Sequence, residues 1–383
     1  MIKVKKMTFS NSEKPAHQVF SDYFSGMQAP RRTNKGHYLY PLEEILFLCI
    51  SAVLSGMDDW SSVHLFGKTK LNWLRQYFPY RHGIPSHDVL GKVFSALDPD
   101  EFSQCFSNWI SSIAEITGGE VVAIDGKTLR GSAQAATGKS ALHVVSAYAS
   151  GNRLCLGQRA VGEKSNEITA IPELLKVLQV SGSIVTIDAM GCQTAIAQSI
   201  KDAGADYVLA VKDNHSELKA QVEKVLALNE RAAMEITLDA GHGRIEKRSC
   251  QATGQLTFLD GKEEWFGLQS IARIVCQRTD KQSGKQSEET RYYISSLPAT
   301  PSVIARAVRS HWAIENNLHW SLDVVFKEDA SLKKKGNAAQ NYHIIAKMAL
   351  TMIERETSSK ASKPQKRRRA ALDDEYRSLL LAG

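Results

Sequence analysis

The chain has 383 residues, of which 43% are hydrophobic and 23% charged, with a formal net charge of +7 and a pI near 8.9. A chain of this length can bury a large core and is expected to hold two or three domains, and the moderate basic excess suits a polyanionic partner. The six cysteines are scattered without a Cys-x-x-Cys pair, which argues against a zinc site or a disulfide framework and suits a reducing compartment.

The N-terminus has no apolar signal segment, and the longest apolar stretch, Ile45–Leu54, is too short and too interrupted to span a bilayer. We therefore expect a cytoplasmic protein with no membrane partner.

Residues 1–115 are predicted to be all-α and to bind DNA. The expected helices cover Leu42–Leu54, Trp60–Phe66, Leu71–Phe78, Asp88–Leu97 and Glu101–Ile113. Basic residues lie between them, including Arg31, Arg32 and Arg81, and could contact DNA phosphates. A plain helical domain with a solvated basic rim is the alternative, and no clear helix-turn-helix signature is present.

From Glu120 the hydrophobic period changes from helical to extended. Three strands are expected at Val121–Ile124, Leu142–Ala149 and Arg153–Val161, followed by a helix at Ile168–Leu178, a buried strand at Ser183–Ile187, a helix at Thr194–Ala203 and a strand at Asp206–Val211. This order is that of the ribonuclease-H-like fold, in which the first and fourth strands are neighbours. The fold class we predict is α/β: a ribonuclease-H-like core over residues 116–356 with a mainly β insertion at about 215–298.

Within that insertion we expect a helix at Ser216–Leu226, a polar stretch at Gly241–Arg248 and strands at Gln255–Phe258, Ser270–Gln277 and Tyr292–Ser295. Arg278–Thr290 is expected to be an exposed hairpin tip. Residues 357–383 form a basic tail, with six basic residues in Lys360–Arg369. Such a tail could bind nucleic acid, although a solvated, disordered terminus is the commoner explanation.

Three carboxylates stand where they would cost free energy unless they hold a cation. Asp125 and Asp188 each follow an apolar, β-branched run, and Glu315 lies in a helix-like stretch. At 3.6 residues per turn, Glu315 falls on one stripe with Val308, Trp312 and His319, which predicts an inward-facing glutamate. Because a buried, unpaired carboxylate is costly, the set predicts a site for two divalent ions and phosphodiester chemistry.

Each carboxylate also has a simpler explanation when taken alone. Asp125 and Gly126 could form a hairpin turn, Asp188 could cap the helix that follows it, and Glu315 could pair with Arg309 or His319 at the edge of the core. Gly126-Lys127-Thr128 is not a phosphate-binding P-loop, because the first glycine of that motif is replaced by Val121.

Six motifs carry a resemblance to a known family. They are Val121–Ser132, Ser165–Leu175, Val185–Gln193, Asp206–Asn214, His242–Glu246 and Arg309–Asp329. In this order they resemble the DDE-type transposases of bacterial insertion sequences, most of all the branch of H-repeat-associated proteins. The resemblance runs from about residue 20 to the tail.

The resemblance implies that Asp125, Asp188 and Glu315 are the catalytic and metal-binding residues, holding two Mg²⁺ ions, with Mn²⁺ as a substitute. The resemblance also implies that the substrate is double-stranded DNA at the inverted-repeat ends of an insertion sequence. At least a dimer of the protein would bind this DNA in the bacterial nucleoid. Candidate phosphate contacts, besides the N-terminal arginines, are Lys127, Arg130, Lys212, Arg244 and Arg309.

One departure from related transposases concerns residues near the glutamate. Where those proteins often carry Tyr, Arg and Lys, this chain has Val308, His311 and Leu322, so these three roles are not carried over. Asp323 and Asp329 stay open as further acids near the site.

Three functions compete at this point: an active transposase, a domesticated or defective relative that binds DNA without mobilising it, and a ribonuclease-H-like nuclease. Inverted repeats flanking the gene would favour the first, and Mg²⁺-dependent cleavage without end specificity would favour the last.

Overall fold

A computed structural model of the chain describes residues 16–30, 39–114, 117–133, 138, 140–162, 165–229, 232–241 and 243–382. The chain divides into two compact units. The first contains residues 1–109, 129–142 and 320–383, and the second contains residues 110–128 and 143–319. Helices from both ends of the sequence therefore belong to one unit, whereas the three-part division predicted from the sequence followed chain order.

The second unit is built on a nine-stranded sheet in the order β3-β2-β1-β4-β5-β9-β8-β7-β6. The strands are β1 (Val121–Leu129), β2 (Leu142–Ala149), β3 (Leu154–Ala160), β4 (Ile184–Ile187), β5 (Asp206–Val211), β6 (Ala233–Gly241), β7 (Arg244–Thr253), β8 (Ser270–Asp280) and β9 (Gln286–Ser295). Strand β1 pairs in parallel with β4, and β4 with β5, so the predicted adjacency of the first and fourth strands is confirmed. Strand β9 pairs antiparallel with β5 and thereby joins β6–β9 to the sheet.

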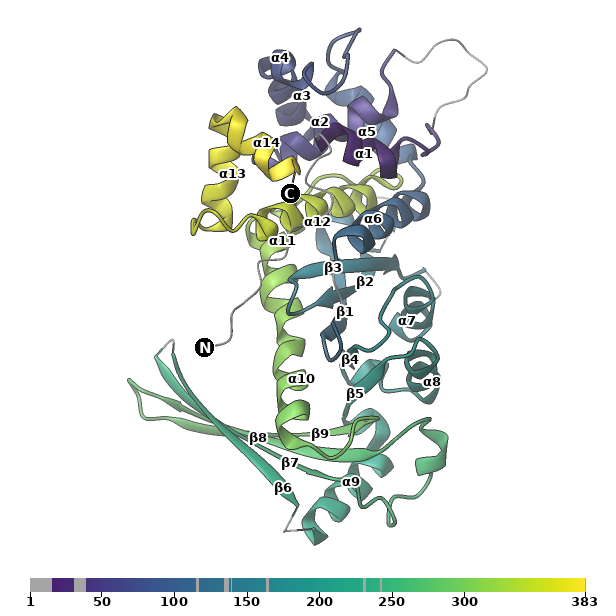
Figure 1. The fold of residues 1–383 in the computed structure, drawn as a ribbon, viewed down its shortest axis with the longest axis vertical. Helices are drawn as coiled ribbons and strands as arrows, with labels where there is room; N and C mark the ends of the chain where they lie inside the picture. The colour runs from purple at the N-terminus through teal and green to yellow at the C-terminus, as the bar shows by residue number, and fades with distance from the viewer. Residues whose placement is uncertain are drawn as a thin grey trace. The chain divides into compact units, whose positions relative to one another are not determined.

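Helices cover both faces of the parallel strands (Figure 1). Helices α7 (Glu167–Leu175) and α8 (Thr194–Asp202) lie on one side, and α10 (Pro301–Ala313) lies on the other. A buried cluster joins α10 to the sheet through Ile304 and Ala307 of the helix and Val121, Ile184 and Val208 of three adjacent strands. Because side chains alternate along a strand, Val121 and Ile184 define which later residues of β1 and β4 face α10.

One expectation in residues 215–298 is wrong. Gln255–Phe258 is a loop, and Phe258 is 72% exposed, so this short run has no packed face to hold it in a strand. Of the polar stretch, Gly241 ends β6 and Arg244–Arg248 begins β7, where Arg248 bonds Asp239 across the strands at 2.8 Å. Strands β8 and β9 extend through most of the predicted hairpin tip, and α9 (Ser216–Leu228) agrees closely with the predicted helix.

The first unit is helical. Its elements are α1 (Ala16–Phe24), α2 (Leu42–Leu54), α3 (Trp60–Thr69), α4 (Leu71–Leu74), α5 (His87–Ala96), most of α6 (Pro99–Ile113), α11 (Trp320–Val324), α12 (Ala338–Arg355), α13 (Lys363–Leu372) and α14 (Asp374–Ala382). Helix α12 packs against α2 and α5, and it is buried along most of its length. The five helices predicted between residues 42 and 113 are confirmed within a few residues, except that α4 is shorter.

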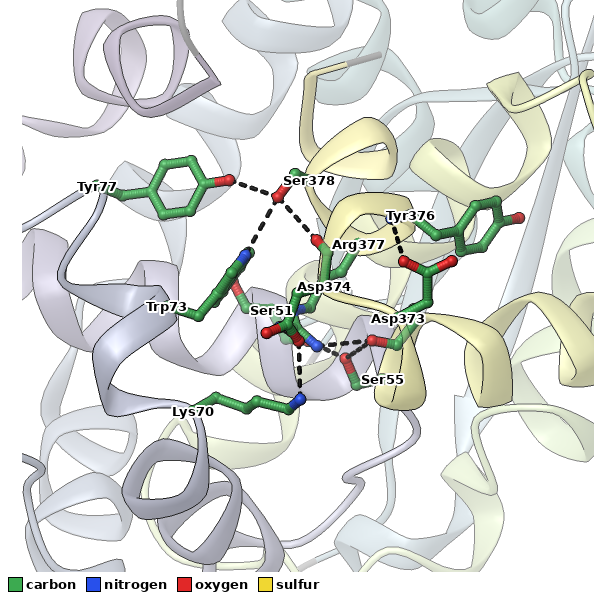
Figure 2. Close-up of polar contacts among 11 residues, drawn as sticks. Ser51, Ser55, Lys70, Trp73, Tyr77, Asp373, Asp374, Tyr376, Arg377 and Ser378 are labelled. Carbon is green, nitrogen blue, oxygen red and sulfur yellow. Dashed lines mark hydrogen bonds and ion pairs between the residues drawn. The ribbon is translucent and has the colours of Figure 1, made fainter.

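The basic tail is folded, so the expectation of a solvated, disordered terminus is wrong. Arg377 of α14 is fully buried and its guanidinium lies 3.9 Å from the centre of the Trp73 ring. Ser378 accepts hydrogen bonds from Tyr77 at 2.6 Å and from the Trp73 indole at 3.1 Å (Figure 2). Lys70 forms an ion pair with Asp374 at 2.7 Å, which also ties α14 to the N-terminal helices.

Within the described ranges, we find no helix with the length and apolar character needed to cross a membrane.

Candidate active site

Asp125 lies inside β1 and faces α10. It is four residues after Val121, whose side chain packs against that helix, and the strand continues to Leu129. The hairpin-turn explanation of Asp125 is therefore wrong. The last register pair of β1 and β4 is Ile124 with Ile187, so Asp125 and Asp188 each stand one residue beyond it. This register accounts for how two residues distant in sequence come to the same edge of the sheet.

Asp188 follows β4 and begins a short 3-10 turn. Its Oδ1 accepts hydrogen bonds from the backbone N–H groups of Met190, at 3.1 Å, and Gly191, at 3.4 Å. Asp188 thus caps this 3-10 turn and not the predicted helix, since α8 has Gln193 at its N-cap position and no side-chain cap. A cap that uses one carboxylate oxygen is compatible with a second role for the same side chain, because an ionised carboxylate offers about four acceptor positions.

Glu315 lies in a π-helical segment, Ile314–His319, that continues α10. The expectation that Glu315 is buried on an inward stripe is wrong, because its residue is exposed whereas Ser321, expected on the opposite side, is fully buried. A π-helix has i→i+5 hydrogen bonds and so fits extra chain into each turn. Within this segment the residues therefore depart from the regular helical period that the prediction assumed.

Two histidines, His311 of α10 and His319 of the π-helical segment, contact β4 and β1 beside the two aspartates. His311 Nδ1 lies 3.0 Å from the Thr186 hydroxyl of β4, and burial lowers the pKa of His311 while the negative charge of Asp188 opposes that shift. His319 Nδ1 lies 3.5 Å from Asp125 Oδ2. The position of the two histidines beside the acidic residues could not be read from their spacing.

A fourth carboxylate, Glu167, lies near Asp125 and was not predicted as part of the site. Glu167 Oε1 is 2.6 Å from His143 Nε2, and His143 Nδ1 is 2.9 Å from the Thr128 hydroxyl. A Cβ at Gly126 would lie 2.1 Å from Glu167 Oε1 and 2.4 Å from His143 Nε2. The backbone after Asp125 therefore packs directly against this pair. The one signal was the Asn166–Glu167 dipeptide, which was interpreted only as a helix start.

The carboxylates act on one another electrostatically. The pKa of Asp125 is raised from 3.8 to about 7, first by burial and then by the negative charges of Asp188, Glu167 and Glu315. Among the residues that the structure describes, no three His, Cys, Asp or Glu side chains are grouped closely enough to hold a metal ion. The donor set nevertheless suits a hard divalent cation, because it consists of carboxylate oxygens whose mutual repulsion such a cation would offset.

A cavity of about 530 Å³ lies between α10 and the strands β6–β9, and Glu315 is on its wall. The wall also includes Arg244, which bonds Glu246 at 2.8 Å, and Arg309, which is 3.7 Å from Asp239. The structure thus brings three predicted site residues, Glu315, Arg244 and Arg309, to one cavity. Trp312 is a further lining residue, and the Arg291 guanidinium lies 4.8 Å from the centre of its ring.

The other predicted contacts are scattered. Lys212 is exposed beside β5, whereas Lys127 is buried at 7% exposure, although a contact to a DNA phosphate needs an accessible ammonium group. Arg81 and Arg130 belong to the first unit and are exposed, and Arg130 lies 4.0 Å from Asp329 there.

Three predicted positions, Arg31, Arg32 and His242, lie outside the described residues. Asp323 and Asp329 both belong to the first unit.

Known transposases match nearly the whole length of the chain. Residues 116–352 match the model of the transposase DDE domain, and residues 21–110 match a model described as DDE_Tnp_1-associated. The chain is 40% identical to "Putative transposase YncI" of Escherichia coli O157:H7 over 95% of each chain. It is 40% identical to "H repeat-associated putative transposase YhhI" of Escherichia coli strain K12, over 90% of this chain and 93% of that protein. A solved piggyBac transposase complex with hairpin DNA superposes with a TM-score of 0.46 and 12% identity, covering 95% of this chain and 81% of that one.

Proposed function

The chain belongs to the transposase DDE domain family, and from that membership we propose that Asp125, Asp188 and Glu315 are its catalytic carboxylates. The protein is a DDE transposase. The observation that most directly supports the assignment is the register of β1 and β4, which sets Asp125 and Asp188 on adjacent strands, each one residue beyond the Ile124–Ile187 pair. The proposed reaction is the cutting and joining of DNA phosphodiesters at the ends of an insertion sequence.

The fold we propose for the catalytic core, residues 116–356, is ribonuclease-H-like, with residues 215–298 as a mainly β insertion. The strand order β3-β2-β1-β4-β5 supports the first part, and the antiparallel strands β9-β8-β7-β6 support the second. The proposed DNA-binding region is the helical segment 1–115. The basic tail, 357–383, is a less suitable DNA-binding segment than its composition indicates, because Lys366 and Arg367 are buried.

The proposed cofactor is Mg²⁺, two ions per site, with Mn²⁺ as a substitute, held by the three carboxylates. When bound, such ions make a water or a DNA 3′-hydroxyl a better nucleophile and stabilise the leaving oxygen. Asp125 has to lose its proton to bind a cation, so its raised pKa makes protons compete with the cation and weakens cation binding as the pH falls. His319, at 3.5 Å from Oδ2, would limit the orientations open to the Asp125 carboxylate.

Arginines near the site would position the DNA backbone. Arg244 and Arg309 line the same cavity as Glu315, and a guanidinium binds a phosphate with two parallel hydrogen bonds. Lys212, Arg81 and Arg130 are further proposed contacts, each with an exposed side chain. The proposed partner is double-stranded DNA carrying the inverted-repeat ends of the element, bound by a dimer because two ends have to be joined.

Cleavage of the DNA that borders the gene tests the proposal. The wild-type protein with Mg²⁺ should cut at the element ends, and Asp125→Asn should abolish cutting while end binding continues. Lys176→Gln is a matched control, because this exposed residue carries a surface ion pair with Glu173 in the same unit. Cutting by Asp125→Asn at the wild-type rate would remove Asp125 from the site. Equal cutting of random DNA by the wild type would favour a nuclease instead.

A further inference from the structure

Strand β6 is an exposed edge of the nine-stranded sheet. It has nine residues, and its only strand neighbour within the described part of the chain is β7. Eight of those nine residues are exposed. Edge strands present a row of unpaired backbone N–H and C=O groups, and proteins usually protect such edges with proline, charged side chains or a bulge. Strand β6 contains no proline or lysine, its two carboxylates, Glu235 and Asp239, lie on the cavity side, and it pairs with β7 in unbroken register from Ala233 to Gly241.

The two faces of β6 have the reverse of the usual polarity. Glu235, Thr237 and Asp239 point to the cavity beside α10. Between them, Met234, Ile236 and Leu238 are 53%, 55% and 71% exposed. An alternating strand normally turns its apolar side chains inward and its polar ones to solvent. The apolar row on the outer face of this edge therefore indicates a partner that covers it.

The charged residues of β6 determine in which register two copies of this strand could pair. A two-fold axis perpendicular to the sheet makes an antiparallel pair in which residues on the same face oppose one another. An axis at Glu235 would set this carboxylate against its own copy. An axis at Thr237 would set Glu235 against Asp239. Like charges directly opposite one another destabilise a sheet, so both registers are disfavoured.

An axis at Ile236 avoids both conflicts. It sets Ile236 against itself, Met234 against Leu238, and Glu235 against Thr237. The apolar residues of both copies then form one continuous row on the outer face, and a carboxylate opposes a hydroxyl on the inner face. An axis at Leu238 also avoids like charges, but it sets Ile236 against Ala240 and leaves Met234 outside the pair.

We propose that two copies of this chain associate through β6, antiparallel and with the two-fold axis at Ile236. The backbone edge supplies the hydrogen bonds, as in other cases of strand addition, and the row of Met234, Ile236 and Leu238 supplies the buried apolar surface. The proposal concerns an interface of the protein and does not depend on which residues carry out DNA cleavage.

Cysteine cross-linking tests the register itself. Directly opposed residues have Cα atoms about 4.5–5.5 Å apart, within the range of about 4.4–6.8 Å that a disulfide spans. Ile236→Cys should therefore form a covalent dimer on mild oxidation. Met234→Cys and Leu238→Cys should each fail alone, because the two copies of either residue lie about 13 Å apart along the strand. A mixture of these two variants should cross-link.

The native cysteines do not obscure this result, because Cys105 is the only one of the six that is not buried. The wild-type protein, oxidised in parallel, measures the background from Cys105. Failure of Ile236→Cys to cross-link, or equal cross-linking by Leu238→Cys alone, would overturn the proposal.

A second measurement uses the protein without oxidation. The wild type should sediment as a dimer and Ile236→Lys as a monomer in sedimentation velocity, whereas Leu65→Lys, at a residue 64% exposed on α3, should sediment as a dimer. Circular dichroism of both variants checks that they fold. If Ile236→Lys keeps the wild-type association state and loses DNA binding instead, the surface belongs to DNA and the pairing is refuted. DNA cleavage by Asp125→Asn is measured in a separate assay, so refutation of the β6 pairing would leave the catalytic assignment unaffected.

Discussion

Replacement of Asp125 by Asn should stabilise the metal-free protein at neutral and alkaline pH. Asn keeps the shape of the side chain but removes the charge that burial and three neighbouring carboxylates oppose. The raised pKa means that the folded protein holds the Asp125 proton up to about pH 7, whereas the unfolded chain loses it near 3.8. Between these values the folded state binds more protons than the unfolded state, so the contribution of Asp125 to stability falls as the pH rises.

The size of this effect follows from the same two values. A rise in pKa from 3.8 to about 7 corresponds to about 4 kcal/mol of lost stability once the pH is above 7, at 1.36 kcal/mol per pKa unit. The Asp125 side chain is 20% exposed, so water screens part of the penalty. We therefore expect Asp125→Asn to gain between about 1 and about 4 kcal/mol over wild type at pH 8, and much less at pH 5.

Urea unfolding of both proteins at these two pH values, in EDTA, measures the difference. Addition of Mg²⁺ at pH 8 should then stabilise the wild type and should stabilise Asp125→Asn much less, because a ligand that binds only the folded state raises stability by mass action. A gain for Asp125→Asn that is the same at both pH values would refute the electrostatic reasoning. Equal stabilisation of both proteins by Mg²⁺ would refute the assignment of Asp125 as a ligand.

Three further predictions concern neighbouring parts of the site. Asp188→Asn and Glu315→Gln should each abolish Mg²⁺-dependent cleavage and leave the DNA dissociation constant close to wild type in a gel-shift assay, and near-normal cleavage by either variant would exclude that residue as a ligand. Gly126→Ala should lower the urea midpoint, because its Cβ would lie 2.1 Å from Glu167 Oε1, and an unchanged midpoint would contradict the close packing. Arg309→Ala should weaken DNA binding at low salt and reduce the salt slope of log K by about 1, as expected for one lost phosphate contact; an unchanged slope would place Arg309 away from the backbone.

The catalytic sheet could be predicted because its central strands carry continuous apolar runs. Val121–Ile124 and Ser183–Ile187 are buried on both faces, and such β-branched runs indicate parallel strands without knowledge of the tertiary structure. The resemblance to the family, together with fold order, then placed Asp125 and Asp188 on adjacent strands, in agreement with the register of β1 and β4. Only Asp188 follows the end of its strand, because β1 continues past Asp125 to Leu129.

The position of Glu315 could not be predicted in the same way. The prediction assumed one helical period from Ile304 to Leu322, but the π-helical segment changes that period at Ile314. A π turn is an arrangement of backbone hydrogen bonds that tertiary packing has to favour, and no residue type in this segment marks it. The error therefore appears at Glu315, while Ile304, Val308 and Leu322 are buried as expected.

The C-terminal helices are a second case in which local composition did not predict the structure. Arg367 stands in the most basic run of the chain, yet it is buried and donates to the Val53 carbonyl from Nε at 3.1 Å and from Nη2 at 2.7 Å. Long basic side chains can be buried where their apolar stems pack and their charged ends find acceptors. The acceptor, the Val53 carbonyl of α2, stands 314 residues before Arg367 in the sequence. Local charge patterning therefore could not reveal it.

The position of Glu315 depends on how α10 packs more than on the sequence around the glutamate itself. Asp125 and Asp188 are held by the hydrogen bonds of one sheet, whereas Glu315 follows a helix attached to that sheet through Ile304 and Ala307. The third carboxylate is therefore placed by the packing of α10, and the first two by the register of the sheet. Mutual repulsion of the carboxylates favours separation, and a cation that binds all three would favour their approach. Packing of α10 and cation binding are therefore expected to be coupled, with the exposed Glu315 as the residue whose position changes most.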